Sequence, residues 1–196
     1  MKVSGVLIAS GASRRLGKPK QLLPWQGSVL INKIIDNIRK SAIEELIIVL
    51  GYKHKEISNV LDKSNQIMIN ENWELGKSES IKMGLHEIAL RSDAVVFFTS
   101  DQPFLSAELF DQIIIKASIT GADIVTTRSG DITSIPTLFK NSTFKSLLDL
   151  QDEDGGKKVI NMQKYETDFV YWDDQRILID IDTECDYQTV LKADRT

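Results

Sequence analysis

The chain has 196 residues, of which 42% are hydrophobic and 27% charged, with a net charge of −4. This composition is typical of one folded globular domain and excludes a disordered chain, while the single cysteine, Cys185, excludes an intramolecular disulfide and a cysteine-rich zinc site. Apolar runs are far shorter than the roughly 20 residues that cross a bilayer and no signal-peptide pattern opens the chain, so we expect a cytoplasmic protein without a membrane partner.

Apolar runs alternate with helix-period stretches along the first two thirds of the chain. The predicted strands are residues 3–8, 46–50, 66–70, 94–99 and 123–127, and the predicted helices are residues 31–38, 53–62, 78–91 and 104–119. Strands that are apolar throughout and alternate with helices form a parallel sheet with helices packed on its faces. The sequence therefore predicts an α/β fold with a mostly parallel sheet.

The pattern loosens after Gly130. The regular segments that follow are strand-like residues 138–139, helical residues 142–150, residues 167–172, which alternate like an exposed antiparallel strand, and residues 177–181, which resemble a buried strand. Thr183 and Asp186 then predict a capping box that begins a last helix. We interpret residues 1–196 as a single domain with an insertion-like lobe at about residues 130–176.

The loop after the first strand concentrates positive charge. Residues 1–35 contain six lysines and arginines and no acid, whereas the rest of the chain carries 18 basic and 28 acidic side chains. In an open α/β sheet a loop in this position binds ligands. Ser10 and Gly11 allow close approach of the backbone, Ser13 adds a hydroxyl, and the bases supply charge. The segment indicates a local anion site and disfavours a broad nucleic-acid surface.

Two familiar phosphate-binding loops do not fit this segment. A Walker A loop has four residues between its glycines, whereas five separate Gly11 from Gly17, and Pro19 follows Lys18 where a serine or threonine belongs. The dinucleotide fingerprint G-x-G-x-x-G is absent as well.

Four ordered motifs within residues 3–190 resemble those of the MobA-like nucleotidyltransferases. The first is IASGASRRLGKPKQLLPWQG (8–27), similar to L-A-A-G-x-S-x-R-x-G-x-x-K-x-L-L-x-x-x-G, and the second is NENWELGKSESIKMGL (70–85), similar to N-x-x-W-x-x-G-x-S-x-S-x-x-x-G-L. The two shorter motifs are SDQPF (100–104), similar to G-D-x-P-F/L, and DIDTECDY (180–187), similar to D-I-D-T-P-x-D-Y/L. Within the superfamily the chain looks most like the molybdenum cofactor cytidylyltransferases. The resemblance implies a three-layer α/β/α Rossmann-like nucleotidyltransferase fold.

The resemblance also implies roles for individual residues. The reaction would join an NTP and a phosphomonoester and release pyrophosphate, with Arg15 holding the β- and γ-phosphates and Lys20 stabilising the α-phosphate. Six residues are expected to bind the nucleotide: Ala9, Ser10, Gly11, Ser13, Ser78 and Ser80. For the last two, plain capping of a helix is an almost equally good interpretation.

Asp101 and Asp182 are the predicted metal ligands. Each follows a predicted strand, and two carboxylates together with substrate phosphates are typical ligands of Mg²⁺. The structural alternatives are a turn or helix-cap aspartate at Asp101 and a structural acid beside Thr183 at Asp182. Asp180 is a weaker candidate for the same site.

The resemblance thus implies an Mg²⁺-dependent enzyme that transfers CMP from CTP to a molybdopterin-type cofactor. The expected recipient of the product is a molybdenum hydroxylase apo-enzyme, and no nucleic-acid partner is expected. The alternatives are guanylyl transfer from GTP, cytidylyl transfer to a sugar or polyol phosphate, and a non-catalytic molybdenum cofactor chaperone. The family's motif G-D-x-G-A-R appears only as residues 152–157, with Glu153 for the aspartate and Lys157 for the arginine. Its motif G-x-P-x-L-F survives only as residues 135–139. Both departures fall in the lobe expected to hold the acceptor.

Overall fold

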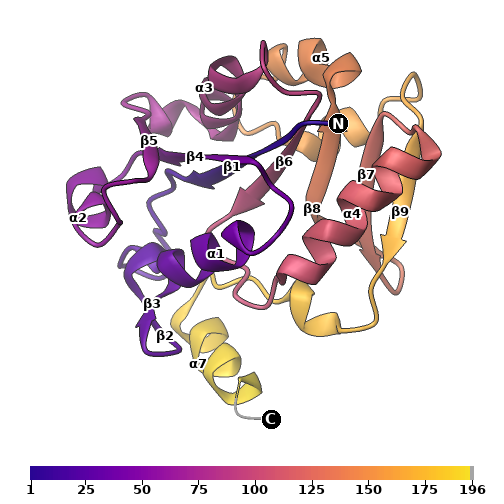
Figure 1. The fold of residues 1–196 in the computed structure, drawn as a ribbon. Helices are drawn as coiled ribbons and strands as arrows, with labels where there is room; N and C mark the ends of the chain where they lie inside the picture. Colours follow the sequence, from indigo (N-terminus) through magenta and orange to yellow (C-terminus); the bar gives the residue numbers. More distant parts are fainter. Residues whose placement is uncertain (195–196) are drawn as a thin grey trace.

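A seven-stranded sheet forms the centre of the computed structural model, which describes residues 1–194. Its strand order is β5-β4-β1-β6-β8-β7-β9, and β8 alone among these strands runs against its neighbours (Figure 1). The strands are β1 (Val3–Ala9), β4 (Glu45–Leu50), β5 (Gln66–Ile69), β6 (Ala94–Thr99), β7 (Ile124–Ser129), β8 (Ile132–Lys140) and β9 (Thr167–Tyr171). A two-stranded hairpin, β2 (Pro24–Trp25) and β3 (Ser28–Val29), stands apart from the sheet.

Helices cover both faces of the sheet. The helices of the described chain are α1 (Leu30–Arg39), α2 (His54–Ser58), α3 (Lys77–Ile88), α4 (Ala107–Thr120), α5 (Phe144–Leu148), α6 (Gly156–Ile160) and α7 (Glu184–Ala193). One buried cluster joins the sheet to α1, α4 and α7, and a second joins its other face to α3, α5 and α6 (Figure 1). This arrangement confirms the three-layer α/β/α prediction. Within residues 1–194, no helix is both long and apolar enough to cross a membrane.

The strands β1 and β6 bring their carboxyl ends to one edge of the sheet. Every residue of β1 is buried, because the strand lies between β4 and β6 and helices pack on both of its faces. Ile8 pairs with Thr99 at the last position of the β1–β6 register. The loop after β1 and the residues after β6 therefore start side by side.

Most predicted elements of the first two thirds are present, and the strand at residues 94–99 is confirmed at both ends. The helix predicted at residues 53–62 is shorter, since α2 ends at Ser58. The short helix α6 and the hairpin β2–β3 were not predicted from the sequence.

Two predictions for the last third are wrong. Residues 167–172 were expected to be antiparallel, yet β9 pairs in parallel with β7, because alternation marks a half-exposed edge strand and carries no information on direction. Residues 177–181 form no strand. A 3₁₀ helix, η4 (Gln175–Leu178), and an extended segment replace it. Ile177 and Ile181 are nevertheless buried, so burial of a short apolar run was mistaken for strand pairing.

Residues 130–176 contribute directly to the sheet. Strand β8 lies between β6 and β7, and β9 forms the edge beside β7. The α-helices of this segment, α5 and α6, lie on the face of the sheet that also carries α3.

Candidate active site

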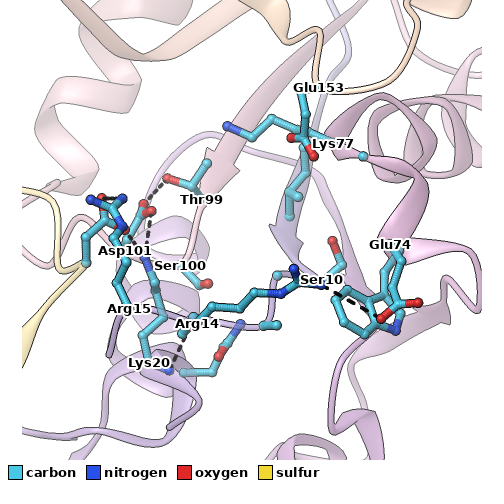
Figure 2. Close-up of a pocket in the computed structure, with 18 residues that line it drawn as sticks. Ser10, Arg14, Arg15, Lys20, Glu74, Lys77, Thr99, Ser100, Asp101 and Glu153 are labelled. Carbon is cyan, nitrogen blue, oxygen red and sulfur yellow. Dashed lines mark hydrogen bonds and ion pairs between the residues drawn. The ribbon is translucent and has the colours of Figure 1, made fainter. Parts of the chain in front are cut away.

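A cavity of about 460 Å³ lies at the edge of the sheet where β1 and β6 end. Seven predicted site residues line it: Ser10, Gly11, Ser13, Arg15, Lys20, Asp101 and Asp182. Figure 2 shows Arg15, Lys20 and Asp101 grouped on one side, with Glu74, Lys77 and Glu153 farther across the opening. Residues from five separate parts of the chain therefore meet around one hollow.

The loop after β1 leaves space for a ligand above its backbone. A Cβ atom built on Gly11 would meet no other atom within 4 Å, so the packing of the protein itself does not require glycine there. Ser13 adopts a positive φ of 51°, and its hydroxyl accepts a hydrogen bond from the backbone N–H of Lys20 at 3.3 Å. This contact folds the loop back on itself and presents Lys20 to the cavity.

Gln21 is a cavity residue that the sequence analysis missed. The residue is 1% exposed and lines the cavity, and its side-chain amide donates a hydrogen bond to the carbonyl oxygen of Ala9 at 2.9 Å. Ala9 itself does not line the cavity. Gln21 thus fixes the position at which β1 passes into the loop, and its place immediately after Lys20 is the only sequence signal for that role.

Lys20 is the centre of a charge cluster that we call the Lys20 cluster: Arg15, Lys20, Asp101 and Asp182. The Lys20 Nζ atom lies 3.2 Å from Oδ2 of Asp101 and 2.9 Å from Oδ1 of Asp182. An Arg15 guanidinium nitrogen lies 2.7 Å from the other carboxylate oxygen of Asp182. The structure therefore brings the two predicted catalytic cations and the two predicted metal ligands into direct contact.

Charge pairing sets the protonation states in this cluster. Burial acts to lower the pKa of Lys20, but Asp101 and Asp182 together outweigh it and the pKa is raised. Burial likewise acts to raise the pKa of Asp182, but Lys20 and Arg15 reverse that effect and the pKa is lowered. Both groups are charged at neutral pH, so the cluster presents two fixed cations and at least one fixed anion to the cavity.

Asp180 lies beside the cluster and does not line the cavity. Burial of its carboxyl group, followed by repulsion from Asp101 and Asp182, raises the pKa of Asp180, although the residue as a whole is exposed. This environment disfavours a third negative charge next to the other two.

Two local structures hold the carboxylates in place. The backbone N–H of Ile181 donates to the carbonyl oxygen of Asp101 at 2.9 Å, which ties the segment before α7 to the end of β6. At the start of α7, Thr183 and Asp186 form the predicted capping box, which confirms that prediction. The Asp186 carboxylate also accepts the N–H of Asp182 at 3.2 Å. These contacts place Asp182 where the predicted strand would have ended.

The carboxylate pair fits a hard divalent cation. Asp101 and Asp182 both contact one ammonium group, so their oxygens converge on a shared point. Among residues 1–194, no cluster of three or more histidine, cysteine, aspartate or glutamate residues could hold a metal ion. An ion bound here would need phosphate oxygens and water for its remaining ligands, which is how Mg²⁺ is usually bound at nucleotide sites.

Ser78 and Ser80 lie beneath the loop rather than in the cavity wall. Both are fully buried. The Ser80 hydroxyl shares a hydrogen bond with that of Ser10 at 2.7 Å and accepts one from the side chain of Asn70 at 2.9 Å. The backbone N–H of Ser78 donates to the carbonyl oxygen of Asp152 at 3.0 Å, so this donor at the start of α3 is already occupied.

A second cavity of about 200 Å³ adjoins the first. Its walls come from β1, β6, β8, α3 and α6, and they are mainly apolar, with Ile81, Phe97, Ile135, Phe139 and Ile160 among them. The segment 152–155 separates the two cavities, since Glu153 lines the first and Gly155 the second. A molecule bound in the second cavity would thus lie next to one bound in the first.

Sequence comparisons place the chain among nucleotide-handling proteins. A model described as the MobA-like NTP transferase domain matches residues 5–168. Nicotine blue oxidoreductase of Paenarthrobacter nicotinovorans is 29% identical over 58% of this chain and 56% of its own. A probable molybdenum cofactor guanylyltransferase of Natranaerobius thermophilus is 31% identical over 63% of this chain and 58% of its own. The chain thus matches little more than half the length of either relative.

Structural comparison gives matches over nearly the whole chain. The crystal structure of Rv0371c from Mycobacterium tuberculosis has a TM-score of 0.89 and 25% identity, and the match covers 98% of both chains. A structure of Rv0371c in complex with manganese has a TM-score of 0.85 and 23% identity, and the match covers 98% of this chain and 100% of that one.

Proposed function

Since the chain belongs to the MobA-like NTP transferase family, we propose that it is an Mg²⁺-dependent nucleotidyltransferase that transfers CMP from CTP to a molybdopterin-type molybdenum cofactor and releases pyrophosphate. The observation that carries this proposal is the Lys20 cluster at the wall of the 460 Å³ cavity. Two cations and two carboxylates at one point are the groups that transfer between phosphates requires. For that reason we favour this activity over the redox activity named for the Paenarthrobacter relative.

The loop after β1 and the Lys20 cluster bind different parts of the nucleoside triphosphate. The backbone around Ser10 and Gly11 faces the open part of the cavity and receives the nucleotide, while Arg15 and Lys20 bind its phosphates. Both cations exchange carboxylate oxygens for phosphate oxygens when the nucleotide enters. Lys20 then stabilises the α-phosphate as negative charge develops there, and Arg15 stabilises the departing pyrophosphate.

Asp101 and Asp182 would hold the metal ion. When bound, Mg²⁺ neutralises charge on the phosphates and draws their oxygens into a fixed geometry. The manganese complex of Rv0371c supports a divalent ion in a protein of this fold. Lys20 would bind the α-phosphate once the nucleotide has entered, which would leave the carboxylates of Asp101 and Asp182 available to hold the ion.

The second cavity is our candidate for the acceptor lobe. We assign the acceptor to residues 130–176, because β8 and α6 supply much of the wall of the 200 Å³ cavity. Its apolar lining suits an acceptor that carries a ring system better than a polyhydroxylated sugar, which favours molybdopterin over a sugar or polyol phosphate.

GTP is the alternative nucleotide. It is favoured by the similarity to the guanylyltransferase from Natranaerobius. CTP is favoured by the residues after β1, because Ser10 replaces one of the glycines typical of the guanylyl branch, and its side chain turns into the core toward Ser80.

We place the reaction in the cytoplasm and name a molybdenum hydroxylase apo-enzyme as the recipient of the product. The free, exposed Cys185 suits a reducing compartment.

Pyrophosphate release that depends on the acceptor is a first test of the proposed reaction. The purified protein is incubated with molybdenum-loaded molybdopterin, Mg²⁺ and one NTP at a time, and we expect release with CTP. Release with GTP alone would assign the guanylyl alternative, and release only when a sugar or polyol phosphate replaces molybdopterin would assign that acceptor. Binding of the cofactor without release with any NTP would refute the enzyme and leave the chaperone.

A further inference from the structure

Lys77 stands where the two cavities meet. Three residues line both of them, Ile8, Lys77 and Thr99, and Lys77 is the only charged one of the three. Figure 2 shows Lys77 and Glu153 on one side of the first cavity, with Lys20 on the other. The position belongs to the variable part of the motif spanning residues 70–85, so the resemblance assigns it no role.

The charge of Lys77 is not neutralised by a neighbour. Among the described residues, no ion pair or side-chain hydrogen bond to Lys77 is formed, and this includes Glu153 on the same rim. The other cations of the first cavity are paired: Arg14 lies 3.9 Å from Glu74, while Arg15 and Lys20 contact Asp182. Among the described cations that line the first cavity, Lys77 is thus the one that needs no carboxylate to leave before it binds an anion; Lys157 lines the second cavity alone.

The backbone that carries Lys77 is held firmly by the segment 152–155. Gly76 adopts a φ of +115°, and a Cβ atom there would lie 2.3 Å from the carbonyl group of Asp152. The next residue but one, Ser78, donates its N–H to the same carbonyl oxygen. The stem of Lys77 packs beside Gly155, where a Cβ atom would lie 3.6 Å from Cδ of Lys77. These contacts direct the side chain along the boundary between the cavities.

A cation at this boundary would reduce the repulsion between the two phosphates that react. The acceptor phosphate is an anion and has to approach a nucleotide phosphate that is also an anion. Lys20 lies beside Asp101 and Asp182, on the side of the first cavity where we place the nucleotide phosphates. We propose that Lys77 binds the phosphate of the acceptor at the junction of the two cavities, with the ring system of the acceptor in the apolar second cavity. This inference rests on the function proposed above.

The bond changes define what Lys77 does. An oxygen of the acceptor phosphate forms a bond to the α-phosphorus of the nucleotide, and the bond from the α-phosphorus to the oxygen that bridges to the β-phosphorus breaks. The electron pair of the broken bond stays on the pyrophosphate. Lys77 neutralises the attacking phosphate throughout and needs to give up no proton.

Kinetics of three variants test the assignment. Lys77→Met removes the charge and keeps the length of the side chain, Lys77→Arg keeps the charge, and Lys82→Met is the matched control on the same helix, where Lys82 pairs with Glu79. We expect Lys77→Met to raise the KM for molybdopterin by about tenfold or more, the range typical for loss of a charged hydrogen bond. The KM for CTP should stay unchanged, Lys77→Arg should restore much of the loss, and Lys82→Met should match the wild type.

A binding measurement separates this inference from the proposed reaction. Molybdopterin is titrated into each protein without NTP, and dephosphorylated molybdopterin is titrated in parallel. We expect Lys77→Met to weaken binding of the first by about tenfold and to leave the second unchanged, since only the first carries the phosphate. Equal affinities of wild type and Lys77→Met for molybdopterin, or no binding by the wild type, would overturn the inference. Binding that depends on Lys77 but no transfer with any NTP would instead refute the reaction.

Discussion

The Nζ atom of Lys20 lies 2.9 Å from Oδ1 of Asp182, although 162 positions separate the two residues in the chain. Lys20 belongs to the first loop, and Asp182 immediately precedes the last helix. The cavity therefore needs both ends of the chain in order to be complete. An unfolded or truncated C-terminal segment would leave Lys20 with Asp101 as its remaining partner in the cluster.

Replacing Lys20 should abolish most of the activity and leave the fold intact. Lys20→Ala removes the charge that stabilises the α-phosphate, and we expect the rate of transfer to fall by about 100-fold or more, as when one transition-state donor is lost. Pyrophosphate release measures the rate, and circular dichroism checks the fold. Lys18→Ala is the control, because Lys18 pairs with Glu184 and does not line the cavity. Wild-type rates in Lys20→Ala would remove Lys20 from the catalytic residues.

Replacing Asp101 should change the response to metal. Asp101→Asn keeps the shape of the side chain but removes one anionic ligand, so we expect about tenfold more Mg²⁺ to be needed for half-maximal rate. Asp173→Asn, at an exposed surface position, is the control. An unchanged Mg²⁺ dependence in Asp101→Asn would argue that this carboxylate does not hold the ion.

Gly11→Ala should separate binding from stability. The added methyl group has free space around it, so we expect a melting temperature like that of the wild type. The same methyl group would occupy the wall of the cavity, and we expect the affinity for CTP to fall by about tenfold, as for one badly placed contact. Calorimetric titration measures the affinity. Normal affinity in this variant would show that the nucleotide does not approach the loop closely.

Gly76→Ala should have the opposite effect on stability. The positive φ and the close carbonyl of Asp152 leave no room for a methyl group, and the backbone strain alone should cost about 1–3 kcal/mol in the free energy of unfolding. Chemical denaturation of the two glycine variants side by side is the measurement. Equal stability of Gly76→Ala and the wild type would contradict the tight packing of α3 against the segment 152–155.

The capping box of α7 should make stability depend on pH in the acid range. Hydrogen bonds from the side chain and the backbone N–H of Thr183 lower the pKa of Asp186. A carboxyl group whose pKa is lower in the folded state adds stability above its unfolded pKa, and loses it as the pH falls through the folded value. We expect Asp186→Asn to lower the free energy of unfolding at pH 7, because it removes the charge that accepts the hydrogen bonds of the capping box. Denaturation at several pH values should show this difference shrinking below pH 4, whereas a difference that grew there would contradict the assignment.

The sequence predicted the sheet and the Lys20 cluster because both depend on local patterns. Fully apolar runs such as residues 94–99 mark buried parallel strands, and the motifs of residues 8–27 and 180–187 carry the charged groups. The approach of these motifs to one another followed from the rule that parallel strands end at one edge, even though residues 177–181 turned out to form no strand.

Features that depend on tertiary packing escaped prediction. The role of Gln21 rests on its contact with the Ala9 carbonyl, and the burial of Ser78 and Ser80 rests on how α3 packs under the loop. Neither has a periodic or compositional signature. The direction of β9 was also undetermined, because it depends on the path of the chain around α5 and α6 rather than on the residues of the strand.

Transfer of label from α-³²P-labelled CTP to molybdopterin in a single turnover is the decisive measurement of the proposed reaction. The label follows the α-phosphate, so it distinguishes transfer from hydrolysis, whereas pyrophosphate release accompanies both. With Mg²⁺ present, we expect the label to appear in a cytidylylated cofactor with the wild type, and about 100-fold more slowly with Lys20→Ala. Label that remained in CTP or appeared only as free CMP, with molybdopterin saturating, would contradict the proposed reaction.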